Sequence, residues 1–492
     1  MKKVLPLLVL LILNFLLKIP FTSQGFFAFT YDQGRDLLVV SRMVYEGKLT
    51  LIGPTTGLQG IFYGPTWYWF LAPLLFLSGG NPQGVANFMG AAAILTIFSI
   101  YFLIKYITKN TPLALSLSLV ASMSKSWMFA PTLIWSPSLV TFFMVLLFFS
   151  VYKIFTSPKP VYFFLLGLLT VLVGDGGEAF GVILTAALLL SPLVFRKQFA
   201  RKEFLLSILG AFFAASPRII FDFKHDFLIT KSVISYFNQP QVYGAKLSIF
   251  ERTIEKLDLF WGIFSDSFTR GNKTAGFVFF ILLLTAIVFI LRNKKMASEI
   301  KTDGLFKYCV FLIITLFIGF TYYPDIVWDY YLVGLPIIFL TLISRVFAVL
   351  LKKKNLNKIT AATLLLLILI NFNKGLLNPF KITWLGDGAT YRNQKMVMDH
   401  IASQNPHEYS FYAFSPAIFD YPFDYLFYWY SKNEKIEAPK DRQNIMFLLI
   451  REASSKKYLT SGWYGDKTRD KTTILESESF AGDLVLEKHQ VK

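Results

Sequence analysis

The sequence predicts an α-helical membrane protein that crosses the bilayer many times and ends in a small α/β domain. Of the 492 residues, 54% are hydrophobic, 17% aromatic and only 16% charged, whereas soluble domains carry roughly 25% charged residues. Long apolar runs recur up to about residue 374, and short basic clusters separate them. From about residue 375 the pattern changes to shorter segments of helical and strand character. We therefore expect a transmembrane domain over 1–374 and a separate domain over 375–492.

The net charge of +18 does not indicate nucleic-acid binding. The basic residues occur in clusters between apolar segments, as they do in cytoplasmic loops that face anionic lipid. No nucleic-acid partner is expected, and membrane lipids are. The single cysteine, Cys309, lies in an apolar run, so no intrachain disulfide framework is possible.

The N-terminal run MKKVLPLLVLLILNFLLKIP has the basic start and apolar core of a signal sequence but no small-residue cleavage site. We interpret it as an uncleaved anchor with its lysines in the cytoplasm. The first outer loop then covers 20–84. Counting lysine and arginine with the positive-inside rule predicts about eleven spans. They are 4–19, 85–104, 111–130, 138–155, 160–174, 178–195, 203–221, 275–292, 308–323, 329–349 and 359–373.

The run from Tyr63 to Gly79 could either span the membrane or lie along its surface. If it spans, every later basic cluster moves outside. If it lies in the interface, every cluster stays inside, and its tryptophans and prolines suit a surface helix. We therefore predict an interfacial helix, with the C-terminal domain outside.

Three further segments interrupt or follow the spans. GDGGE, between two short spans, is expected to dip below the outer surface and to form a cavity wall, because polar backbone at membrane depth must be satisfied by protein or water. The outer loop over 222–274 is expected to hold about two short helices. In the C-terminal domain, YRNQKMVMDHIASQ predicts a helix, EYSFYAF, NIMFLLIRE and DLVLEKH predict strands, and IFDYPFDYLFYWYSK predicts an aromatic helix or surface segment.

The polar stretch FTYDQGRD, directly after the first apolar run, is the strongest candidate for chemistry. If Asp32 opens a helix, the i, i+4 spacing places Asp32 and Asp36 on one face with Arg35 beside them. A carboxylate at a membrane surface can act as a general base, and an arginine can bind phosphate. Alternatively, Asp32 caps the helix and Asp36 pairs with Arg35 in solvent.

Other polar residues fall on the same predicted face. Ionisable residues at the ends of membrane helices are functional candidates. Arg218, Lys224 and His225 are candidates for donor phosphate binding, together with Arg35; for Arg218 the alternatives are snorkelling or an ion pair with Asp222. The candidate substrate pocket comprises Tyr63, Asp175, Glu178, Asp222, Asp329 and Tyr330. Asp175 and Glu178 could instead cap a helix, and Asp329 and Tyr330 could anchor a span.

Soluble-enzyme signatures do not occur: the sequence contains no P-loop, GxGxxG, GxSxG or HExxH. This excludes nucleotide-driven transport by this chain alone. His225 with Asp222 and Asp226 offers a weak metal-ligand pattern in a loop. We therefore expect no metal and no cofactor.

At this point the layout resembles that of the GT-C superfamily, especially its protein O-mannosyltransferase and lipid A aminoarabinose transferase branch. The resemblance covers roughly the first 350 residues and rests on YDQGRDLLVVSRMVYEGK, the surface helix YGPTWYWFLAPLLFLSGGNP and PRIIFDFKHDFL. In that branch the first outer loop carries an acidic pair; Asp32 matches its first position and Gln33 replaces the second. Where that branch often has Lys-Pro-Pro or His-Gly-Pro, this chain has Tyr63, Gly64 and Pro65, so a cation is lost.

The resemblance implies a glycosyltransferase that moves a sugar from a polyprenyl-phosphate carrier to a hydroxyl acceptor at the outer face of the cytoplasmic membrane, with inversion. Asp32 would be the general base, and the acceptor would be a lipid, a glycan or a protein. Two rivals stay open: a flippase or transporter of lipid-linked glycans, and a membrane-anchored binding scaffold. Transporters place ionisable groups mid-span at repeat interfaces, whereas these acids cluster at one boundary.

Overall fold

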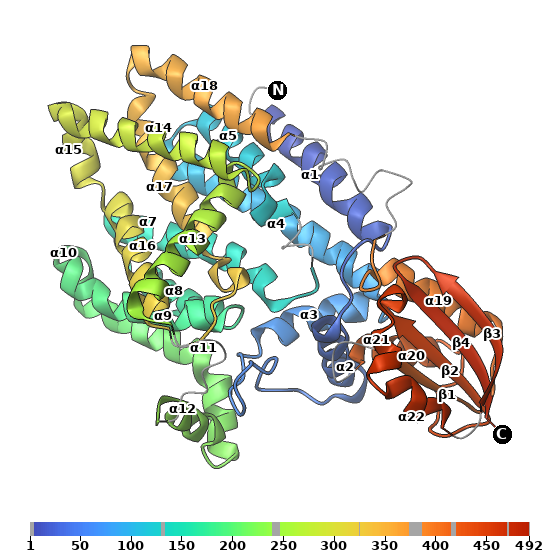
Figure 1. Cartoon of the computed structure of the whole chain (residues 1–492). Coiled ribbons are helices and arrows are strands. Elements are labelled where there is room, and N and C mark those ends of the chain that lie inside the picture. Colours follow the sequence, from blue (N-terminus) through green and yellow to red (C-terminus); the bar gives the residue numbers. More distant parts are fainter. Residues whose placement is uncertain are drawn as a thin grey trace.

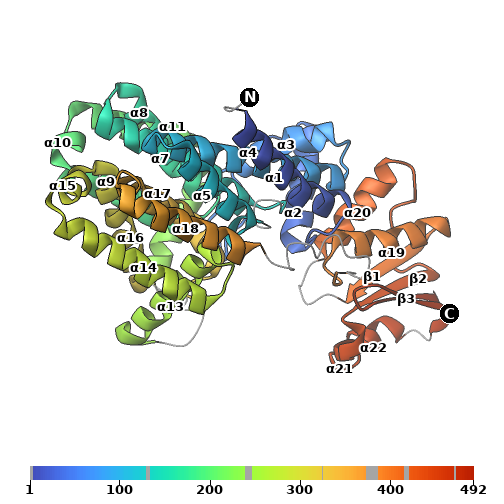
Figure 2. The same ribbon diagram turned by 90° about the horizontal axis from the view of Figure 1, so that it is seen from above.

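The computed structural model describes residues 4–128, 133–238, 247–323, 325–372, 386–414, 420–469 and 472–491. It consists of a large helical bundle and a smaller C-terminal α/β domain beside one end of it (Figures 1 and 2). The domain boundary predicted near residue 374 falls in 373–385, outside the described residues.

Helices stand at all eleven predicted spans. They are α1 (Leu5–Ser23), α4 (Pro82–Thr108), α5 (Thr111–Met123), α7 (Val140–Thr156), α8 (Pro160–Gly174), α9 (Glu178–Val194), α11 (Leu205–Lys224), α14 (Lys273–Arg292), α16 (Gly304–Tyr322), α17 (Leu335–Leu350) and α18 (Lys354–Asn371). Six helical segments of the described chain, those containing α1, α4, α7, α11, α14 and α16, are long and apolar enough to cross a membrane. The protein is therefore a multi-pass membrane protein.

Short basic helices mark one end of the bundle. α10 (Arg196–Phe199) and α15 (Lys294–Thr302) both lie at the end away from the C-terminal domain in the two views (Figures 1 and 2). Their lysines and arginines belong to two of the clusters used to predict the cytoplasmic side. The arrangement of the bundle thus keeps these clusters apart from the polar first loop.

The first outer loop folds into two helices. α2 (Tyr31–Glu46) begins at a capping box, in which Gln33 accepts hydrogen bonds from the backbone N–H and Oγ1 of Thr30 at 2.9 and 2.6 Å. α3 (Thr66–Leu77) has 12 residues, about 18 Å at 1.5 Å per residue, which is too short to cross a bilayer. This length agrees with the interfacial position predicted for Tyr63–Gly79.

The second outer loop forms α12 (Leu228–Asn238) and α13 (Ile249–Phe268), the two helices expected there. α13 is more than a surface helix, because Phe260, Phe264 and Phe268 are buried. Phe264 stacks on Phe279 of α14 at 5.7 Å and meets Phe339 of α17 edge-on at 5.6 Å. This packing fixes α13 to the bundle.

The C-terminal domain contains a four-stranded sheet with the strand order β1-β2-β4-β3. β1 (Tyr409–Phe414) and β2 (Ile445–Arg451) are parallel, and β4 (Leu484–Val491) is antiparallel to both β2 and β3 (Thr472–Phe480). α19 (Tyr391–Ser403) and α20 (Tyr421–Lys432) confirm the two expected helices. Short helices α21 (Lys457–Thr460) and α22 (Trp463–Thr468) connect β2 to β3.

The apolar core of the C-terminal domain is continuous with that of the first loop. One cluster of buried apolar side chains joins the first loop, α2 and α3 to the sheet and its helices. Backbone bonds also cross the boundary: Phe29 N–H donates to the carbonyl of Ala389 at 2.8 Å, and Tyr391 N–H donates to that of Phe27 at 3.0 Å. The first loop and the C-terminal domain therefore form one packed unit.

Candidate active site

The acidic pair of α2 is built around Arg35. Arg35 donates to Asp36 Oδ1 from Nε at 3.0 Å and Nη2 at 2.8 Å, and its Nη2 lies 3.1 Å from Asp32 Oδ1. Trp67 Nε1 donates to Asp36 Oδ2 at 2.8 Å, and the Tyr68 hydroxyl donates to Oδ1 at 3.2 Å. Arg35 therefore contacts both of the carboxylates that the i, i+4 spacing was expected to place on one helix face.

The two acids nevertheless differ in access. The Asp32 side chain is 39% exposed, whereas that of Asp36 is fully buried at 0%. Burial raises the pKa of Asp36 to about 6, although Arg35 and the Trp67 N–H act in the opposite direction. Asp36 cannot touch a substrate without rearrangement, so the expectation of a catalytic Asp36 is replaced by a positioning role: it holds Arg35 and α3.

Gln33, at the position of the second acid in the resembling family, is a structural residue. Its side chain turns back onto Thr30 to close the capping box and is 4% exposed. The substitution therefore places no group in the site. Of the three polar residues Asp32, Gln33 and Asp36, Asp32 alone is open to solvent.

A second buried carboxylate lies at the start of α3. Asp175, between α8 and α9 and 1% exposed, accepts a hydrogen bond from Thr66 Oγ1 at 2.5 Å and forms an ion pair with Arg218 Nη2 at 3.1 Å. Burial raises the pKa of Asp175, opposed by Arg218, Thr66 and the amide of Gly64. A Cβ on Gly64 would lie 2.0 Å from Asp175 Oδ1, so only glycine allows this approach.

This arrangement corrects one expectation. Arg218 pairs with Asp175 instead of Asp222, because Asp222 accepts hydrogen bonds from Ile229 N–H at 2.7 Å and Thr230 Oγ1 at 2.5 Å, and so caps α12. Asp175 and Gly176 of the GDGGE segment border a small void together with Thr66 and Trp67. The side chain of Glu178 is outside the described part of the structure.

The first turn of α3 connects the two carboxylates. Thr66 binds Asp175 and the next residue, Trp67, binds Asp36. A displacement of α3 would therefore disturb both acids together. No sequence motif pointed to this turn, since Trp67 was interpreted only as an interfacial residue.

The charge of Asp32 influences the Tyr330 hydroxyl. Tyr330 lies in the short helix η4 (Asp329–Leu332), with its ring 4.9 Å from that of Trp135. Burial raises the pKa of Tyr330, and Tyr331 and the charges of Asp32 and Asp329 add to the effect. Asp329 is exposed and its carboxylate accepts the backbone N–H of Tyr330 at 2.8 Å.

The remaining predicted residues lie at the rim. Lys224 and His225 are exposed at the end of α11, and the His225 ring stacks on Phe221 at 3.9 Å. Tyr63 is half-buried in the loop before α3, where its backbone carbonyl accepts the Gly53 N–H at 2.8 Å. The exposed Lys224 and His225 side chains can be reached by a ligand.

The C-terminal domain touches α2 at Gly34. A Cβ there would lie 2.3 Å from the carbonyl carbon of Tyr421, so glycine permits α20 to begin directly against α2. The rings of Tyr31 and Tyr421 meet edge-on at 4.8 Å, and Arg35 lies 5.5 Å from the centre of the Tyr31 ring. Tyr421 is thus a neighbour of the site from 390 positions along the chain, which no local pattern could reveal.

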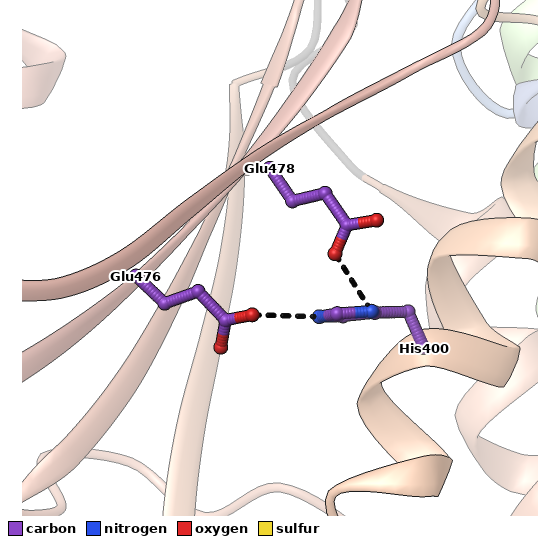
Figure 3. Close-up of side chains that lie close together, drawn as sticks. All are labelled: His400, Glu476 and Glu478. Carbon is purple, nitrogen blue, oxygen red and sulfur yellow. Dashed lines mark ion pairs between the residues drawn. The ribbon is translucent and has the colours of Figure 1, made fainter.

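The described residues contain one His/Glu cluster with metal-like spacing, and it lies in the C-terminal domain (Figure 3). His400 Nδ1 is 2.8 Å from Glu478 and its Nε2 is 3.7 Å from Glu476. The Gln404 amide nitrogen lies 2.9 Å from His400 Nε2 and 2.8 Å from Glu476, and Lys488 donates to Gln404 at 2.7 Å. Because these contacts already fill the space between the ligand atoms, we interpret the cluster as an ion-pair network that joins α19 to β3.

These features define a class: a multi-pass α-helical membrane protein with paired carboxylates at one end of the bundle, packed against a C-terminal α/β domain. No protein-family model and no curated protein matches the sequence.

Solved structures identify the fold. ArnT from Cupriavidus metallidurans bound to undecaprenyl phosphate aligns over 99% of this chain and 98% of its own, with 12% identity and a TM-score of 0.62. Its apo state aligns over 99% and 97%, with 11% identity and a TM-score of 0.63. An Archaeoglobus fulgidus oligosaccharyltransferase in complex with Zn and sulfate matches at a TM-score of 0.47 with 14% identity over 82% of this chain and 56% of its own. The chain therefore has the fold of ArnT.

Proposed function

We propose that the protein is a glycosyltransferase that moves a sugar from a polyprenyl-phosphate carrier to a hydroxyl acceptor. The observation that carries the proposal is the accessible carboxylate of Asp32, which lies beside Arg35 in a fold shared with ArnT. ArnT has been crystallised with undecaprenyl phosphate, which supports a lipid-phosphate carrier for this chain. We place the reaction at the outer face of the cytoplasmic membrane, on the grounds of the lysine and arginine count.

In the proposed reaction Asp32 takes the proton of the acceptor hydroxyl as its oxygen attacks the anomeric carbon. The bond from that carbon to the phosphate oxygen breaks, and polyprenyl phosphate leaves with the electron pair. A single displacement from the opposite side inverts the configuration. No metal or cofactor is needed in this scheme, and the acceptor is a lipid, a glycan or a protein.

Arg218 is the proposed phosphate ligand. Its guanidinium is 25% exposed and is oriented by Asp175, so its remaining N–H groups can meet phosphate oxygens in a planar arrangement. Arg35 already serves two carboxylates and is 14% exposed; its role is to fix Asp32. Exposed Lys224 and His225 would contact the outer part of the headgroup.

The experiment is sugar transfer in proteoliposomes from a panel of polyprenyl-phosphate sugars, with wild type, Asp32→Asn and Asp222→Asn compared. Loss of a general base should lower the rate by about 10²- to 10⁴-fold. Asp222→Asn is the control on the same face, because Asp222 caps α12. Full turnover in Asp32→Asn would contradict the assignment. Movement of a labelled lipid-linked sugar across the bilayer without product would favour the flippase.

A further inference from the structure

A cavity lies between α4 and α7, far from Asp32. It has a volume of about 650 Å³. Its apolar part is formed by Phe102, Leu146 and Phe149, and its polar end by Lys105, Tyr106 and Lys109. No residue of the proposed active site borders it.

The cavity is at the opposite end of the bundle from that site. α4 has 27 residues, about 40 Å at 1.5 Å per residue, and the cavity occupies its last turns. The start of α4 follows Gly80, whose carbonyl accepts the Tyr425 hydroxyl of the C-terminal domain at 2.7 Å. A ligand in the cavity would therefore be unable to reach Asp32.

The apolar part opens outward from the bundle. Phe102 is 52% exposed and Leu146 37% exposed, and both belong to helices long and apolar enough to span the membrane. In such helices, exposed apolar side chains face hydrocarbon. An acyl chain can therefore enter the groove sideways from the bilayer.

The polar end concentrates positive charge. Lys109 Nζ lies 4.0 Å and Lys153 Nζ 5.0 Å from the centre of the Tyr106 ring, while Lys105 Nζ lies 5.4 Å from that of Tyr101. All three ammonium groups lie over aromatic rings, and that of Lys153 also hydrogen-bonds to the side chains of Tyr106 and Tyr162. The rings orient the lysines without neutralising them.

We propose that this groove binds an anionic glycerophospholipid, with an acyl chain against Phe102, Leu146 and Phe149 and the phosphate at Lys105 and Lys109. A net-negative headgroup suits three unneutralised lysines, whereas a zwitterionic lipid would bring a further cation to them. These lysines lie at the boundary that the positive-inside count assigns to the cytoplasm, whose leaflet carries anionic lipid. The inference does not depend on the proposed transferase activity.

The test is native mass spectrometry of the full chain in detergent with added dioleoyl-phosphatidylglycerol or dioleoyl-phosphatidylcholine. Wild type should retain phosphatidylglycerol over phosphatidylcholine, and Lys105→Glu/Lys109→Glu should weaken that retention by at least about tenfold. Lys294→Glu/Lys295→Glu, exposed in α15 at the same end, is the matched control and should behave like wild type. Leu146→Trp blocks the apolar part of the groove while keeping the lysines, and should also reduce retention of phosphatidylglycerol. This variant provides the test if the charge variant does not fold.

Three results would overturn the proposal: equal retention of the two lipids by wild type, unchanged phosphatidylglycerol binding in both groove variants, or displacement of the lipid by undecaprenyl phosphate at equal concentration. If wild type has the mass of a dimer, and the charge variant is a monomer that still retains the lipid, a second copy of the chain covers the groove instead.

Discussion

The ion pair between Arg218 and Asp175 allows a phosphate-binding role of Arg218 to be separated from a structural role. Arg218→Gln removes the cation from a carboxylate that is 1% exposed. Removing one partner of a buried ion pair costs about 3–5 kcal/mol. The cost should be smaller here, because Asp175 keeps its hydrogen bond from the Thr66 hydroxyl at 2.5 Å and Arg218 is partly exposed. We therefore expect Arg218→Gln to lower the free energy of unfolding by about 2–3 kcal/mol.

The double variant Arg218→Gln/Asp175→Asn removes the stranded charge and should restore most of the thermal stability in detergent. It should not restore donor binding. A charge-assisted hydrogen bond to phosphate contributes about 1.5–3 kcal/mol, equivalent to about a 10- to 150-fold rise in the Kd for a polyprenyl-phosphate sugar. Both variants should show that rise, and Asp175→Asn alone a smaller one, because Arg218 stays in place but is less well oriented.

The assays are thermal unfolding followed by intrinsic fluorescence and donor binding to the same preparations. The reasoning fails if the double variant recovers donor affinity together with stability, because Arg218 would then act only as the partner of Asp175. It also fails if Arg218→Gln binds donor as wild type does.

Three further predictions concern α2 and the C-terminal domain. Burial raises the pKa of Asp36 from 3.8 to about 6, so its contribution to stability is present below about pH 4 and is lost as the pH rises through 6. Sugar transfer, in contrast, should fall below about pH 6, because protonation of Asp36 weakens its hold on Arg35. In a pH profile of transfer, Asp36→Asn should not show this fall on the acid side. Gly34→Ala should separate α20 from α2, lower the free energy of unfolding by about 1–3 kcal/mol and expose the C-terminal domain to limited proteolysis. Gly262→Ala, at a position with open space around it, should have neither effect. Equal protease resistance of the two variants would argue against the contact. Replacing His400 by Ala should destabilise the C-terminal domain by about 1 kcal/mol and leave transfer intact, and a large increase in the melting temperature of wild type on adding Zn²⁺ would show that its cluster is a metal site after all.

Much of the helical framework could be predicted because each span carries its own signal. Apolar runs and basic clusters located the eleven helices, and the short length of α3 is already visible in the run between Tyr63 and Gly79. β3 was missed for a physical reason: most of its side chains are exposed, so the strand shows no apolar alternation. β2, whose central residues are buried, was easily recognised.

The site was predictable only where its residues are close in sequence. The spacing of Asp32, Arg35 and Asp36 predicted that they would lie close together on one helix. That Asp36 is buried depends on Trp67 and Tyr68, and the partner of Arg218 comes from a different helix pair. Such pairings are set by packing between distant segments, which residue spacing does not encode.

The shared core of the first loop and the C-terminal domain has a consequence for biosynthesis. Residues 25–46 leave the ribosome early, but the backbone and apolar partners that complete their packing, from Ala389 onward, follow more than 300 residues later. Until those partners are synthesised, the apolar side chains of this segment lack their packing partners, a state that is prone to misassembly. Chains truncated before residue 386 should therefore insert their helices yet fail to acquire an ordered α2.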